Sequence, residues 1–104
     1  ANLSGANLNG ANIKDSFMNG TNLRGAHMRA TLLDRTYLNG SDLGGADLSA
    51  ALFERAYLNG SNLSGANLNG ALIERAYLNG ANLNGATWTD GGKCKDGSIG
   101  ECKK

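Results

Sequence analysis

A five-residue repeat runs through most of this 104-residue chain and limits the folds that it can adopt. From Ala1 to Ala86, every fifth residue is Ala, Ser or Thr, without exception in 18 units. The residue two places later is always large and apolar, from Leu3 to Trp88, and Gly closes 11 of the units. Asn or Asp often stands between the small and the apolar residue, so the unit is A-(N/D)-L-x-G.

A period of five fits neither an α-helix nor a single long strand. On a helix, Leu3, Leu8, Ile13 and Met18 would rotate by about 140° per unit and circle the whole surface. On a strand, the same residues would alternate between its two faces. A chain that turns a corner at each x-Gly pair can instead point every apolar residue inward. We therefore expect short extended segments joined by corners.

A second period of twenty residues indicates how these segments stack. The sequence at Leu32–Gly40 recurs in similar form at Leu52–Gly60 and Leu72–Gly80. Four units would then make one turn, and the inward residues would form four columns in which Leu mostly stacks on Leu. This predicts an all-β solenoid of about four and a half coils over residues 1–90, with strand-like spacing between coils. Its interior is expected to be packed solid, without a channel or ligand pocket.

The A-(N/D)-L-x-G units from Ala1 to Asp90 resemble the pentapeptide-repeat family, whose fold is a right-handed quadrilateral β-helix. The segment from Thr87 to Cys102 is similar to the ends of exported members from cyanobacteria and from chloroplast thylakoid lumens. The resemblance implies a cap at the C-terminal end, which we place at residues 91–104. It also implies export to the thylakoid lumen or the periplasm.

Cys94 and Cys102 enclose a Gly-rich segment that bends easily. We expect a structural disulfide that fastens the cap, which would require an oxidising compartment. Two free thiols in a reducing cytosol are the alternative. A zinc site would need two more ligands, which are not at hand, so we predict no metal and no cofactor.

One face of the predicted solenoid departs from the Asn-rich background. Four columns of residues spaced twenty apart run along it. Leu32 belongs to an apolar column and Asp34 to an acidic one, and the other two columns are basic and aromatic. Tyr and Arg are enriched in binding hot spots, which favours a flat protein-binding face. The alternative is that stacked rings and acid–Arg pairs only stabilise the fold. The candidate binding residues are Phe17, Arg35, Tyr37, Arg55, Tyr57, Arg75 and Tyr77.

Charge and residue content exclude several other functions. The formal net charge of +1 argues against a nucleic-acid partner, and no apolar run approaches the length of a membrane helix. The only histidine, His27, falls in a column of Asn and Asp residues, and no catalytic set emerges around it. We therefore predict that the protein is not an enzyme.

These observations predict an exported, non-enzymatic module that binds a protein partner. A peripheral subunit of a photosynthetic membrane complex is one specific form of this hypothesis. Some pentapeptide-repeat proteins resemble B-form DNA and regulate DNA gyrase, which is the alternative, but such mimicry needs an acidic surface. A consensus-like repeat without any partner is a third interpretation. Unpaired backbone at the solenoid ends would also favour end-to-end self-association.

Overall fold

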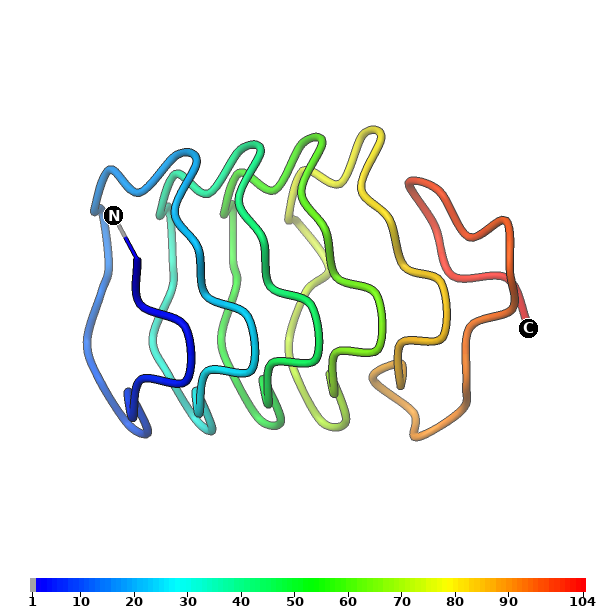
Figure 1. The fold of residues 1–104 in the computed structure, drawn as a ribbon, viewed down its shortest axis with the longest axis horizontal. Helices are drawn as coiled ribbons and strands as arrows, with labels where there is room; N and C mark the ends of the chain where they lie inside the picture. The colour runs from blue at the N-terminus through cyan, green and yellow to red at the C-terminus, as the bar shows by residue number, and fades with distance from the viewer. Residues whose placement is uncertain (1) are drawn as a thin grey trace.

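The chain winds into a stack of similar coils (Figure 1). The computed structural model describes residues 2–104, so Ala1, the first small residue of the predicted repeat, lies outside the described residues. Fourteen parallel β-bridges each join a residue to the one twenty places later, as in Asn22 to Asp42. The bridges fall in four rows, one for each five-residue unit of a turn. The chain therefore returns to an equivalent position every twenty residues.

The pairing between coils is strand-like but never continuous. Residues 2–104 contain no helix and no strand longer than one bridged residue. At a typical bridge, the Leu23 N–H donates to the Asp42 C=O at 2.7 Å, and the Asp42 N–H donates to the Thr21 C=O at 3.0 Å. A corner then interrupts the pairing, so the predicted β-solenoid has no continuous sheet. The described residues accordingly include no helix that is long and apolar enough to cross a membrane.

The corners explain the glycine that closes most units. At one corner, the Ala26 N–H donates to the Leu23 C=O at 3.0 Å, and Gly25 has a φ of +64°. A turn with this bond and a positive φ at its third residue favours glycine, because a Cβ would be strained there. Five corners nevertheless place another residue in this left-handed region, with φ between 55° and 60°: Asp15, Ala30, Arg35, Ala50 and Arg55.

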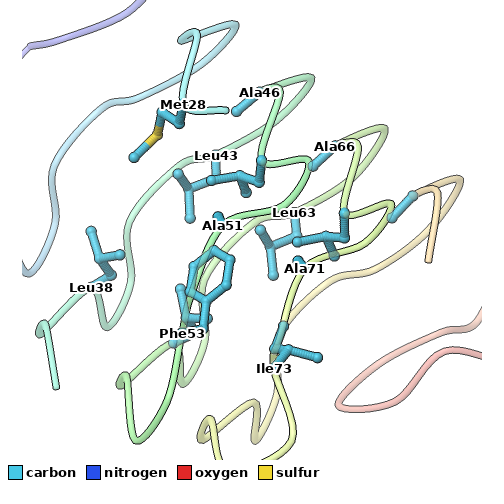
Figure 2. Close-up of a cluster of buried hydrophobic side chains, with 14 of the residues drawn as sticks. Met28, Leu38, Leu43, Ala46, Ala51, Phe53, Leu63, Ala66, Ala71 and Ile73 are labelled. Carbon is cyan, nitrogen blue, oxygen red and sulfur yellow. The ribbon is translucent and has the colours of Figure 1, made fainter. Parts of the chain in front are cut away.

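The third residue of each unit points inward and forms the core (Figure 2). In the middle of the stack these side chains are fully buried, and Phe53 is the largest of them. The first residue of each unit is small because it also lies inside, where Ala46, Ala56 and Ala66 have no exposed surface. Burial of each large side chain contributes about 1.5–3 kcal/mol, which allows a fold without helices to be stable.

Residues beyond Asp90 leave the repeat and fold back across the last coil. Thr87 pairs with Lys93, and Asn82 pairs with Ile99, both antiparallel. The Leu83 N–H donates to the Ser98 C=O at 2.7 Å. This segment therefore supplies hydrogen-bond partners to the backbone of the last coil, as a further coil would. It extends only two of the four rows of bridges, because the other two end at Leu72 and Tyr77 within the described residues. The C-terminal segment thus caps half of the last coil.

Candidate protein-binding face

The predicted aromatic column forms one continuous stack of rings. Adjacent ring centroids lie 4.9 Å apart for Phe17 and Tyr37, 4.4 Å for Tyr37 and Tyr57, and 4.8 Å for Tyr57 and Tyr77. The angles between ring planes fall from 21° to 8° along the stack. The parallel bridges between the same residues impose this geometry, because they hold successive side chains at strand spacing. We call these four residues the aromatic ladder.

The stacking hides the faces of the inner rings. Phe17, at one end, is 82% exposed, and Tyr77, at the other, is 45% exposed. Tyr37 and Tyr57 between them are half-buried. Leu72, in the neighbouring column, is 58% exposed, whereas Leu32 and Leu52 are half-buried. Exposed apolar surface on this face therefore gathers at the two ends of the ladder.

The basic column is paired unevenly with acidic residues. Arg35 donates two hydrogen bonds to Asp15, from Nε at 2.7 Å and from a terminal nitrogen at 3.2 Å. These bonds lower the pKa of Asp15 and raise that of Arg35. Arg75 forms an ion pair with Glu54, in which a terminal guanidinium nitrogen lies 3.3 Å from Oε1. Arg55 is exposed and makes no ion pair with any residue in 2–104, which leaves its guanidinium available to a partner.

Asparagine side chains form a ladder that we did not predict. Asn59 N–H donates to the Asn39 side-chain oxygen at 3.0 Å, and Asn79 N–H donates in the same way to Asn59 at 3.0 Å. The same bond, at 2.8 Å, joins Asn39 to Asn19. The Asn-Gly pairs that recur every twenty residues contain this signal, although the x-Gly pattern by itself predicts only corners. This ladder adds one hydrogen bond between successive coils at the turn that follows each aromatic residue.

The predicted Asn and Asp columns are present, with a local role. Asn22 and most of its equivalents accept a hydrogen bond from the backbone N–H two residues later, here that of Arg24 at 3.1 Å. Such bonds stabilise the corner that follows. His27 lies exposed in this column, between Asn7 and Asp47. Within residues 2–104, no group of three or more His, Cys, Asp or Glu side chains could hold a metal ion.

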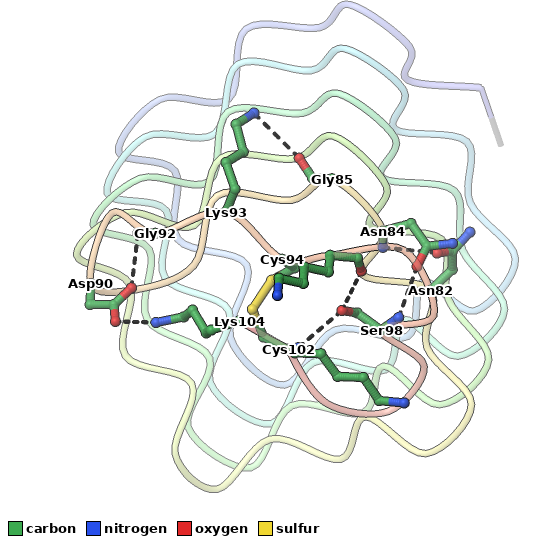
Figure 3. Close-up of a disulfide and its surroundings, with 12 residues drawn as sticks. Asn82, Asn84, Gly85, Asp90, Gly92, Lys93, Cys94, Ser98, Cys102 and Lys104 are labelled. Carbon is green, nitrogen blue, oxygen red and sulfur yellow. Dashed lines mark hydrogen bonds and ion pairs between the residues drawn. A yellow bond between two sulfur atoms is a disulfide. The ribbon is translucent and has the colours of Figure 1, made fainter.

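The cap contains the predicted disulfide between Cys94 and Cys102 (Figure 3). Their Cα atoms lie 5.0 Å apart, and Cys94 is buried against the last coil. Ser98 Oγ donates to the Lys95 C=O at 2.6 Å and accepts from the Lys103 N–H at 3.0 Å. The disulfide therefore closes a small, internally bonded loop, and the prediction of a covalent link in the cap is confirmed.

The five-residue period, the stacked coils and the glycine corners define a pentapeptide-repeat fold. The family model for pentapeptide repeats matches residues 1–40, 31–70 and 51–90, and the chain belongs to this family. Members of the family are generally non-catalytic. A comparison with curated proteins gives no match.

Several solved structures are similar to this one. Rfr23, a pentapeptide repeat protein from the cyanobacterium Cyanothece 51142, is 29% identical, with a TM-score of 0.52 over 75% of this chain. QnrB1, a plasmid-mediated fluoroquinolone resistance protein, is 16% identical, with a TM-score of 0.62 over 84% of this chain. The chain spans 56% and 50% of those two proteins. A pentapeptide repeat protein from the thylakoid lumen of Arabidopsis thaliana is 25% identical over 86% of this chain and 69% of its own, with a TM-score of 0.33.

Proposed function

We propose that the protein is a non-enzymatic module that presents a rigid, flat face to a protein partner. The face consists of the aromatic ladder with Arg35, Arg55 and Arg75. The unpaired guanidinium of Arg55, two residues before Tyr57 of the aromatic ladder, is the observation that carries the proposal. A purely structural ladder would be expected to pair each Arg with an acid, as Arg35 is paired with Asp15. Arg and Tyr on a preorganised surface supply binding energy at low entropic cost.

We further propose that the protein works in an oxidising compartment, either a thylakoid lumen or a periplasm. The Cys94–Cys102 disulfide supports this location, because such bonds are rare in a reducing cytosol. A peripheral subunit of a photosynthetic membrane complex remains the specific form of the hypothesis. Regulation of DNA gyrase has less support, since a net charge of +1 does not resemble the phosphate backbone. For the fold, we propose a right-handed, four-sided helix of about four and a half coils.

The binding hypothesis can be tested by affinity capture from an extract of the source compartment with oxidised protein as bait. The test bait carries Arg55→Glu and Tyr57→Ser. The control bait carries Tyr57→Phe, which keeps the ring stack and removes only the hydroxyl. Circular dichroism must show that all baits are folded, because loss of two stacked pairs would cost about 1–3 kcal/mol. A partner that is retained by the control and lost by the test bait would support the proposal, and one retained equally by both would refute it.

A further inference from the structure

We propose that the half of the last coil left open by the cap docks an extended, basic peptide segment of a partner protein. The site is an open groove of about 540 Å³. Its lining residues include Ile73, Ala76 and Leu78, together with Trp88 and Gly100–Cys102. We call it the terminal groove. It lies at the end of the solenoid, so it is separate from the aromatic–arginine face proposed above, apart from Tyr77, which borders both.

The backbone of the terminal groove is a coil edge without a partner. In the coil below, the N–H groups of Phe53 and Leu58 donate to the next coil at 2.9 and 2.8 Å. The equivalent N–H groups of Ile73 and Leu78 have no acceptor within residues 2–104. Unpaired N–H and C=O groups in strand geometry are the features to which an extended peptide can add as a further strand. They therefore point to a peptide backbone as the ligand.

The groove also exposes the end of the apolar core. Leu78 and Trp88 are only partly buried, whereas Leu58, one coil below Leu78, is fully buried. Tyr77, which also lines the groove, is 45% exposed and is among the most exposed large apolar residues of the protein. Apolar area beside an open backbone edge favours a peptide that places an apolar side chain inward at alternate positions.

The charged residues that line the terminal groove favour a basic peptide. Glu74 and Glu101 are the only charged residues that line the groove. Neither makes an ion pair with another described residue, and the sequence neighbour Arg75 pairs with Glu54 instead. Two unpaired carboxylates that line the same groove, one from the last coil and one from the cap, attract Lys or Arg on the bound chain. An acidic peptide would be repelled.

The cap disfavours a second copy of this chain as the occupant. A complete coil of another solenoid would need all four rows of bridges, and the cap already occupies two of them at Asn82 and Thr87. Figure 3, viewed along the stack, shows the cap segment crossing the end of the solenoid. A short extended segment needs only the remaining half and avoids this clash.

Binding can be measured by fluorescence anisotropy with an eight-residue peptide in which Lys alternates with Val. One control peptide has Glu in place of Lys, and a second carries N-methyl groups that remove backbone donors. We expect Glu101→Lys to weaken binding of the Lys peptide by about three- to five-fold at low salt. Asp96→Lys makes the same charge change elsewhere in the cap and should leave the affinity within about two-fold. Ala76→Leu should fill the groove and abolish binding.

Pairing between the peptide backbone and the edge of the last coil can be measured separately. Hydrogen exchange of the Ile73 and Leu78 amides should slow when the Lys peptide binds, and the N-methylated peptide should neither bind nor protect them. Equal binding of both peptides, equal effects of the Glu101 and Asp96 substitutions, or protection confined to the aromatic ladder would overturn the proposal. Concentration-dependent dimerisation that protects the same two amides without peptide would also overturn it, in favour of a second copy. Arg55→Glu alone, which leaves the ring stack beside Tyr77 intact, should keep the affinity within about two-fold, and this separates the test from that of the proposed face.

Discussion

The left-handed corners allow a direct test of how the five-residue period determines this fold. Gly45 ends a unit with a φ of +65°, and beyond its two chain neighbours no atom lies within 4 Å of the position that a Cβ would take. Substitution by Ala at this site therefore changes backbone strain without creating a clash. A left-handed conformation costs a residue with a Cβ about 1–2 kcal/mol. Ala regains about 0.5–1 kcal/mol because it loses less entropy on folding than Gly. We expect Gly45→Ala to destabilise the protein by about 0.5–1 kcal/mol.

The next corner along the chain provides the reciprocal experiment. Ala50 is exposed and has a φ of +59°, so its strain is already present. By the same reasoning, Ala50→Gly should stabilise the protein by about 0.5–1 kcal/mol. Each substitution should move the melting temperature by about 2–8 °C, in opposite directions.

Urea unfolding followed by circular dichroism is the appropriate assay, because it reports on all coils. Trp88 fluorescence would report mainly on the last coil, where this residue lies. The double variant with both substitutions should return to the stability of the parent protein within about 0.5 kcal/mol, provided that the two corners act independently. If both single variants shift stability in the same direction, backbone strain is not what selects glycine at these corners.

Three further predictions concern the core, the cap and acid stability. Ala56→Leu should overpack the fully buried interior and cost about 1–3 kcal/mol in urea unfolding, whereas Ala76→Leu, in the same column but partly exposed, should cost less than half as much. Serine at both Cys94 and Cys102 should lower stability by about 2.5 kcal/mol, which reduction of the parent protein should reproduce in the same assay. Desolvation raises the pKa of Asp42, but hydrogen bonds from the Gly44 N–H and from Arg24 outweigh it and bring that pKa below 3.8. The stability that this carboxylate contributes is present above its unfolded pKa and is lost as the pH falls through the lower folded pKa. Asp42→Asn should therefore flatten the decline in the free energy of unfolding that is measured below about pH 4.

Much of the fold follows from the sequence because one unit is repeated with little change. Once the five-residue period is recognised, stacking at twenty residues fixes which side chains meet, and the aromatic ladder follows directly. The columns of acidic residues and arginines are equally visible in the sequence, but the ion pairs that they form are not. Arg35 pairs with Asp15 and Arg75 with Glu54, while Arg55 pairs with neither neighbouring acid. Which acid each Arg pairs with depends on competition between side-chain conformations of similar energy, and the sequence does not show which conformation is favoured.

The cap illustrates a different limit. Its disulfide could be predicted, because a short Gly-rich loop between two cysteines has few alternatives. Its antiparallel pairing with Asn82 and Thr87 could not, since residues 91–104 carry no period. The uncovered half of the last coil, and with it the terminal groove, could therefore be found only in three dimensions.

The geometry of the aromatic ladder also determines where on the proposed face a partner can gain binding energy. Stacking at 4.4–4.9 Å removes ring faces from solvent, so the inner residues Tyr37 and Tyr57 offer mainly edges and hydroxyl groups. The same contacts that stabilise the coils thus reduce the apolar area available for binding. The remaining exposed groups are the unpaired Arg55, Phe17 at the N-terminal end and Tyr77 beside Leu72 at the C-terminal end. Because hot spots require groups that lose their exposure on binding, Phe17, Arg55 and Tyr77 should dominate the affinity of this face, and the inner rings should act mainly by holding the stack in place.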